Sequence, residues 1–209
     1  MKKILLTLFA AGCLFTCSAQ TELSLKWNLM QHANSQDSLV IDELRCYVSN
    51  ISLWQDTTLI WQDPISAHLI DLADSTTCLM QLPDLQQKKF NLIKFNLGID
   101  STTNVSGAMG GDLDPTKGMY WTWQSGYINM KIEGHRSKAF QYHIGGYAAP
   151  NNALQEVKLH IVDQHNTNIY FDSQALIAFA LAKGFYHIMS PSTAACQLAQ
   201  KAAQLFSIQ

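Results

Sequence analysis

The chain has 209 residues, of which 47% are hydrophobic and only 14% are charged, and its formal net charge is −2. This length fits a single domain. Lysine and arginine form no basic stripe along the chain, which argues against nucleic acid and against anionic membrane surfaces as partners. With so few charges, we expect uncharged polar side chains to cover much of the surface.

The first twenty residues, MKKILLTLFAAGCLFTCSAQ, have the layout of a secretory signal peptide. Two lysines precede an apolar run, and small residues precede Gln20. We therefore expect residues 1–19 to be removed and the mature protein to be exported to the periplasm, the cell surface or the medium. A lipid anchor at Cys13 is the alternative. No second apolar run of about 18 residues follows, so we expect no transmembrane segment after cleavage.

Cleavage would leave three cysteines, Cys46, Cys78 and Cys196. Three thiols allow at most one disulfide, so the domain is not a disulfide-built scaffold and needs a hydrophobic core. Each thiol lies in an apolar context, where cysteine is usually inert.

The chain from residue 20 to about 171 alternates apolar and polar residues in short segments broken by Asp, Asn, Gly and Pro, which is typical of an all-β domain. The alternation changes phase around residues 50–53, which indicates a bulge or a bend. Residues 107–118 have the composition of a loop, and residues 124–126 that of a hairpin turn. The expected strands are 21–29, 44–53, 67–72, 90–97, 120–133 as a hairpin, 139–145, 157–162 and 166–171.

The last part of the chain changes pattern, because Ala and Leu recur at helical spacing in residues 173–183 and 192–206. Ser192, behind Pro191, has the position of a helix N-cap. The sequence therefore predicts an antiparallel β-sandwich with a C-terminal helical segment, formed as one domain by residues 20–209.

Several segments resemble a known family. They are GDLDPTKGMYWTWQSGYINMKIEG at 111–134, LRCYVSNISLW at 44–54, FQYHIGG at 140–146 and MSPSTAACQLAQKAAQLFSI at 189–208. Together they resemble the MbnP-like proteins, exported copper-binding proteins related to the partner protein of methanobactin gene clusters and to methanotroph surface copper proteins. The resemblance implies a β-sandwich that binds copper through histidine imidazoles and a tryptophan oxidised to kynurenine. It also implies a separate di-haem partner of the cytochrome c peroxidase type, which performs that oxidation.

Copper in an exported site favours imidazole and soft sulfur ligands. The seven histidines form no closely spaced pair, so any site must be assembled from distant segments. His143 is the first candidate ligand, because it lies on an expected strand inside FQYHIGG. His68, on the expected strand AHLID, is the second. A core histidine bonded to a backbone carbonyl is the alternative at His143.

The remaining candidates carry less weight. His32, His135, His160 and His165 are expected at the surface or in loops, and His187 is left open. Met109, Met119 and Met130 are expected to fill the core, with thioether ligation of Cu(I) as the alternative. Trp121 and Trp123 are expected to share one strand face in the core, with redox chemistry as the alternative. Glu133, at a strand end, would need a partner if it is buried, and backbone N–H groups and the neighbourhood of Lys131 are the alternatives.

No catalytic motif is present, neither G-x-S-x-G nor H-E-x-x-H, so we do not expect an enzyme. The leading hypothesis is an exported copper-binding protein with copper held by His143 and His68. The alternatives are a metal-free interaction or structural sandwich of the cell envelope, and a redox partner or substrate of a di-haem peroxidase.

Overall fold

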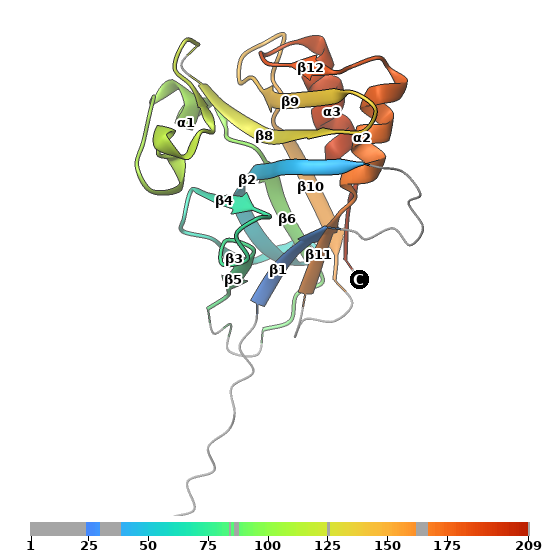
Figure 1. Cartoon of the computed structure of the whole chain (residues 1–209). Helices are drawn as coiled ribbons and strands as arrows, with labels where there is room; N and C mark the ends of the chain where they lie inside the picture. The colour runs from blue at the N-terminus through green and yellow to red at the C-terminus, as the bar shows by residue number, and fades with distance from the viewer. Residues whose placement is uncertain are drawn as a thin grey trace, which may run out of the picture.

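A computed structural model describes residues 24–29, 39–83, 85, 88–124, 126–161 and 167–208. The expected signal peptide, residues 1–19, lies outside these ranges. Within them the chain forms two β-sheets with helices near the C-terminus (Figure 1). The mostly-β prediction is therefore confirmed. None of the described helices is long and apolar enough to cross a membrane.

The smaller sheet has the strand order β13-β11-β1-β5. The larger sheet has the order β10-β6-β2-β8-β9-β12, with β3 and β4 paired to β2 and β7 paired to β8. The strands are β1 (Ser24–Leu29), β2 (Val40–Gln55), β3 (Thr58–Gln62), β4 (Ala67–Asp71), β5 (Leu79–Gln81), β6 (Leu92–Leu97), β7 (Tyr120–Trp121), β8 (Gly126–His135), β9 (Ala139–Gly145), β10 (Gln155–His160), β11 (Thr167–Phe171), β12 (His187–Ile188) and β13 (Phe206–Ile208).

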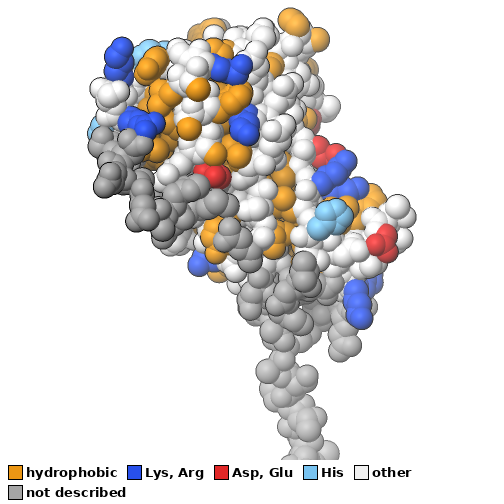
Figure 2. All heavy atoms as spheres, turned by 90° about the vertical axis from the view of Figure 1, so that its right-hand side faces the viewer, with side chains coloured by type: hydrophobic (Ala, Val, Ile, Leu, Met, Phe, Trp, Pro, Cys, Tyr) orange, Lys and Arg blue, Asp and Glu red, His pale blue; other side chains and the backbone are white. Residues whose placement is uncertain are grey.

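The helices are α1 (Ser101–Val105), α2 (Ser173–Ala182) and α3 (Thr193–Ala203), with two 3-10 turns at Gly111–Leu113 and Pro115–Lys117. The expected cap of α3 is confirmed, since the Ser192 side chain accepts a hydrogen bond from the Ala195 N–H. Helix α3 packs on β9 and β10. On the side of the molecule where the helices lie, hydrophobic side chains alternate with Lys and Arg (Figure 2).

The long strand β2 organises the larger sheet. Its first half pairs with β8 on one edge and β4 on the other, and its second half pairs with β6 and β3. Between the halves, Asn50 has a φ of 52° and the register with β6 shifts between Ser49 and Ser52. The predicted irregularity at 50–53 is therefore a bend that lets one strand serve two pairs of neighbours.

The main core lies between the two sheets and beneath the helices. Trp27 of β1 makes edge-to-face contacts with Phe95 of β6 and Phe206 of β13, at ring-centroid distances of 5.0 and 6.4 Å. A second cluster, which includes Tyr47 and Tyr127, lies on the other face of β2. The two faces of the first half of β2 are thus covered by two different sets of side chains.

Two strand pairs differ from the expected antiparallel pattern, because β1 runs parallel to β11 and β9 runs parallel to β12. The hairpin prediction also needs one correction. Strand β7 ends at Trp121, which is buried at 6% exposure. Trp123 lies beyond the strand, in the turn, and is 66% exposed. The expected core position of Trp123 is therefore wrong.

We expect Gly98→Ala to lower the free energy of unfolding by about 2 kcal/mol or more, since a left-handed non-glycine residue and a lost buried hydrogen bond each cost energy. Gly98 has a φ of +110°, and a Cβ there would lie 2.3 Å from Cγ of Asn129. The Asn129 Oδ1 accepts the Ile99 N–H at 3.1 Å. Chemical denaturation measures the change.

Gly107→Ala is the matched control, because Gly107 also has a positive φ but a Cβ there meets nothing within 4 Å. Equal losses in the two variants would contradict the close packing of Asn129 against Gly98.

Candidate metal centre

A row of charged side chains crosses one face of the larger sheet. Residues paired across neighbouring strands share a face, and the pairs Asp71 with Arg45, Arg45 with Lys131, and Lys131 with His143 extend this face over four strands. We call the following residues the polar ladder: Glu43, Arg45, Asp71, Lys131, Glu133 and His143.

Positive and negative side chains alternate along the polar ladder. Arg45 Nε lies 2.9 Å from Asp71 Oδ2 and 3.2 Å from Glu43 Oε1, although Nε lacks hydrogen-bond alignment to either carboxylate. Lys131 Nζ lies 2.8 Å from Glu43 Oε2 and 3.4 Å from Glu133 Oε1. Partly buried charges need such partners, because the loss of hydration is costly. The predicted partnership between Glu133 and Lys131 is confirmed.

His143 ends the ladder on β9 and is 9% exposed. Its Nε2 lies 2.7 Å from Glu133 Oε1, and the Gln141 amide donates to Glu133 Oε2 at 3.4 Å. Burial raises the pKa of Glu133, but the hydrogen bond from His143, the charge of Lys131 and the Gln141 amide outweigh burial and hold this pKa below its ordinary value. Glu133 is therefore a carboxylate that orients the imidazole.

The pair with Glu133 leaves the other ring nitrogen of His143 available. An N–H at Nε2 that donates to the carboxylate places the lone pair on Nδ1. Among the described residues nothing bonds this Nδ1, and it is not sealed from solvent. Metal-binding histidines usually donate their second ring nitrogen to a carboxylate in this way. The predicted ligand His143 thus has a suitable environment, and its role as a ligand stays a prediction.

His187 lies on the same face as His143. It pairs with Gln141 across the parallel strands β12 and β9, and it is exposed. His143 is two residues further along β9, so the Cα atoms of the two histidines lie about 8 Å apart, given a strand spacing of about 4.8 Å and a rise of about 3.3 Å per residue. A change of rotamer could turn the His187 imidazole toward His143.

Trp121 also borders this face. An added Cβ on Gly145 would lie 2.7 Å from Cζ3 and 2.9 Å from Cη2 of Trp121, so the indole covers Gly145. Gly145 is two residues from His143 on β9 and shares its face. The Trp123 ring lies 6.0 Å from the Trp121 ring, with the planes 52° apart. Two tryptophans therefore lie beside the strand that carries His143.

His68 lies elsewhere. It pairs with Val48 on β2 and therefore shares the sheet face opposite to that of Tyr47 and the polar ladder. Strands β4 and β9 are three strand spacings apart, or about 14 Å. The structure does not bring His68 and His143 together, so a single ion cannot bind both.

His68 resembles His143 in one respect, since a carboxylate oxygen contacts Nε2 of each imidazole. Its Nε2 lies 2.5 Å from Oδ2 of Asp63, a carboxylate that is almost fully buried. His68 lines a pocket of about 320 Å³ with Met80, Asp112 and neighbouring residues. His68 thus remains a second, separate candidate ligand.

Sulfur ligands have little support. Cys46 is buried, and burial together with Cys78 raises its pKa to about 12. Burial also raises the pKa of Cys78, so both thiols stay protonated near neutral pH. Met119 and Met130 are buried in the core, as expected, but the expected core position of Met109 is wrong, since Met109 is 44% exposed. Across the described ranges, no group of three His, Cys, Asp or Glu side chains is arranged to hold a metal ion.

The carboxylates of the glycine-rich loop have structural roles. Asp114 accepts a hydrogen bond from the Thr116 N–H and caps the second 3-10 turn. Asp112 accepts from the Leu69 N–H at the free edge of β4 and pairs with Lys117 at 2.6 Å. The loop is thereby fastened to the sheet beside β4.

A family model, MbnP, matches residues 14–197. The chain belongs to the MbnP family. MbnP from Methylosinus trichosporium has a similar solved structure, with a TM-score of 0.50 and 14% identity, over 75% of this chain and 77% of that one. An identity this low supports the shared fold and no more. No curated protein matches the chain.

Sequence reasoning named His143 but could not select Glu133 as its partner or His187 as its neighbour in this MbnP-family chain. A signal for the first pairing is present, because Lys131-x-Glu133 and Gln141-x-His143 each place two polar residues on one face of neighbouring strands. The position of His187 depends on a parallel pairing between segments far apart in the chain, which no local pattern reveals.

We expect Gly145→Ala to displace the Trp121 indole, since the new methyl group would overlap it and the Tyr127 carbonyl oxygen. Overpacking of this kind costs roughly 1–3 kcal/mol. Denaturation and the tryptophan emission wavelength report the change. Gly110→Ala, where an added Cβ meets nothing within 4 Å, is the control. An unchanged emission spectrum in Gly145→Ala would contradict the placement of Trp121.

We expect Asp112→Ala to destabilise the fold by about 1 kcal/mol near neutral pH, because the Leu69 N–H loses its acceptor. Burial raises the pKa of Asp112. Hydrogen bonds from Lys117 and the Leu69 N–H, together with nearby positive charge, lower this pKa by more than burial raises it, so the folded-state pKa lies below its ordinary value. A lowered folded-state pKa stabilises the fold above the unfolded-state pKa, and that stabilisation disappears as the pH falls through the folded-state pKa.

The stability difference between wild type and Asp112→Ala should therefore narrow below about pH 4. Denaturation curves at a series of pH values measure it. A difference that stays constant down to acid pH would contradict a role for the ionised carboxylate.

Proposed function

We propose that this protein is a non-enzymatic copper-binding protein and that copper binds at Nδ1 of His143. Membership of the MbnP family supports the copper chemistry, through the resemblance described for the sequence. The observation that carries the location is the 2.7 Å contact between His143 Nε2 and Glu133 Oε1, which fixes the imidazole and frees its second nitrogen.

The residues present fit copper in part. Imidazole is a good ligand for copper, and a carboxylate behind it raises its basicity. His187, diagonal to His143 on β12, would supply a second imidazole after a change of rotamer. Trp121 and Trp123 lie beside this position. The family resemblance implies an oxidised tryptophan without selecting which one, and the alternatives are Trp27, Trp54 and Trp61. Bound copper would supply redox chemistry, while the chain supplies the oriented imidazoles.

Export and the di-haem partner belong to the same proposal. The exposed indole of Trp123 is the one of the two tryptophans that an oxidising partner protein could reach from solvent. The alternative, a metal-free interaction or structural sandwich, is favoured by the lack of a ready three-ligand group in the described parts of the chain.

Copper titration of the mature protein distinguishes these functions. We expect His143→Ala to weaken copper binding, measured against a competing chelator, by about 100-fold or more, and Glu133→Gln by about 10–100-fold, as for other residues that support a ligand. His187→Ala should also weaken binding, whereas His68→Ala should not.

His160→Ala is the matched control, because His160 is exposed on β10. Copper affinity that survives His143→Ala unchanged would contradict the proposed location. No copper binding by the wild-type protein, in its natural oxidation state, would favour the metal-free alternative.

A further inference from the structure

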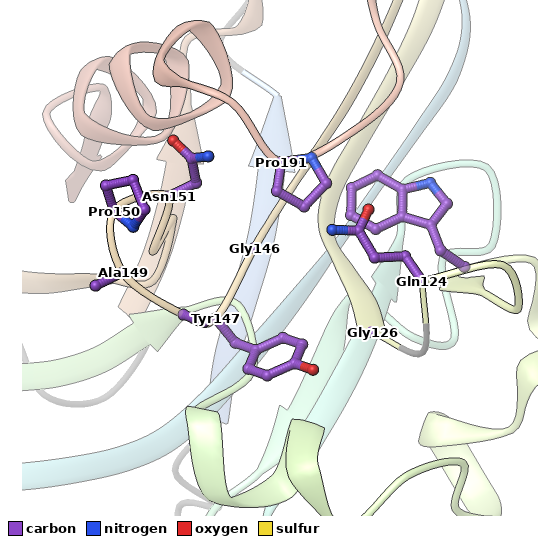
Figure 3. Close-up of a pocket in the computed structure, with 10 residues that line it drawn as sticks. Gln124, Gly126, Gly146, Tyr147, Ala149, Pro150, Asn151 and Pro191 are labelled. Atoms are coloured by element: carbon purple, nitrogen blue, oxygen red, sulfur yellow. The ribbon is translucent and has the colours of Figure 1, made fainter.

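A separate pocket of about 210 Å³ opens beside the β7–β8 hairpin. Three segments surround it: the hairpin, the loop that follows β9 and the segment before α3. Tyr147, Pro150, Pro191 and Gln124 lie around the opening in Figure 3, with Asn151 beside Pro150. Its remaining walls come from Trp121, Gly126, Gly146, Ala148 and Ala149.

The walls of the pocket are held in place by the backbone. Tyr147 O accepts from Ser101 Oγ at 2.6 Å, and Gly146 O accepts from the Ala153 N–H at 2.9 Å. Gly146 has a φ of +123°, and a Cβ there would lie 2.1 Å from the Asn151 carbonyl oxygen, so the loop requires glycine. A fixed pocket spares a ligand the cost of ordering the loop.

The chemistry of the lining points to a neutral, polar ligand. Among the described residues, no Lys, Arg, His, Asp or Glu lines the pocket, so an ion would find no counter-charge from them. The side-chain amides of Gln124 and Asn151 make no hydrogen bond with any described residue. Each amide offers both donors and an acceptor, which suits neighbouring hydroxyl groups. A purely apolar ligand would displace water from these amides without replacing the hydrogen bonds that the water made to them.

Aromatic surface completes the site. Trp121 forms one wall, and the exposed Trp123 lies next to it with ring centroids 6.0 Å apart. The negative face of an aromatic ring attracts weakly positive C–H groups. A volume of about 210 Å³ suits one small ring, with the rest of a larger ligand outside the pocket. A ring with hydroxyl edges and a C–H face meets all of these conditions.

We propose that this pocket binds a neutral sugar unit at the end of a glycan, with its hydroxyl groups on Gln124 and Asn151. The next unit of the glycan packs on Trp123. The pocket shares Trp121 and Trp123 with the surroundings of the proposed copper position, but sugar binding does not require copper, because none of the proposed polar contacts belongs to the polar ladder.

Saturation-transfer NMR on metal-free protein tests the proposal, with cellobiose, maltose and N,N′-diacetylchitobiose as probes and glucuronic acid as the charged comparison. We expect saturable binding of at least one neutral disaccharide and none of glucuronic acid. The double variant Gln124→Ala/Asn151→Ala should weaken binding by about tenfold or more, since two hydrogen bonds are lost.

Gln200→Ala, an exposed amide on α3, is the matched control and should leave binding unchanged. Trp123→Ala should weaken disaccharide binding more than binding of the matching monosaccharide. The proposal is overturned if no neutral disaccharide binds, if the double variant binds as well as wild type, or if indole competes for the pocket while sugars do not.

Discussion

The bend of β2 at Asn50 is the constraint on which the rest of the structure depends. One strand of 16 residues pairs with β8 and β4 before the bend, with β3 after it, and with β6 on both sides of it. After the bend, Leu53 belongs to the core shared with the smaller sheet. Before it, both faces are used, since Cys46 belongs to that core and Tyr47 to the second cluster.

The polar ladder begins on the part of β2 that precedes the bend. Arg45 lies on the face that the second cluster covers only in part, and its charge is balanced by Glu43 on β2 itself and by Asp71 on the paired strand β4. Alternation of charge across β4, β2 and β8 leaves Glu133 at the far end, where the imidazole of His143 completes the row. A structural need for charge balance thus produces an oriented histidine with one free nitrogen, and the proposed copper site follows from it.

Local patterns were enough to predict most elements of the fold. Alternation located β9 at residues 139–145, the phase change located the bend near Asn50, and Ser192 located the start of α3. Features that depend on distant pairing could not be predicted. The parallel pairs of β1 with β11 and of β9 with β12 join segments far apart in the chain.

In the candidate site, too, local patterns predicted some features, while others depend on distant strand pairing. His143 could be selected from its strand, but its partner Glu133 depends on the register of β8 with β9, and its separation from His68 depends on which face of the sheet each histidine occupies. Trp123 was misplaced because a strand pattern cannot show where a hairpin turn begins. Trp121 was placed correctly because it is still paired with Gly126.

Paramagnetic line broadening by Cu(II) in ¹H–¹⁵N spectra of the wild-type protein tests the central claim most directly, because the broadening falls off with distance from the ion. We expect substoichiometric Cu(II) to broaden first the amide signals of β8, β9 and β12 around His143. Broadening centred on β4 and the segment around Asp63, with β9 unaffected, would contradict it and place the copper at His68.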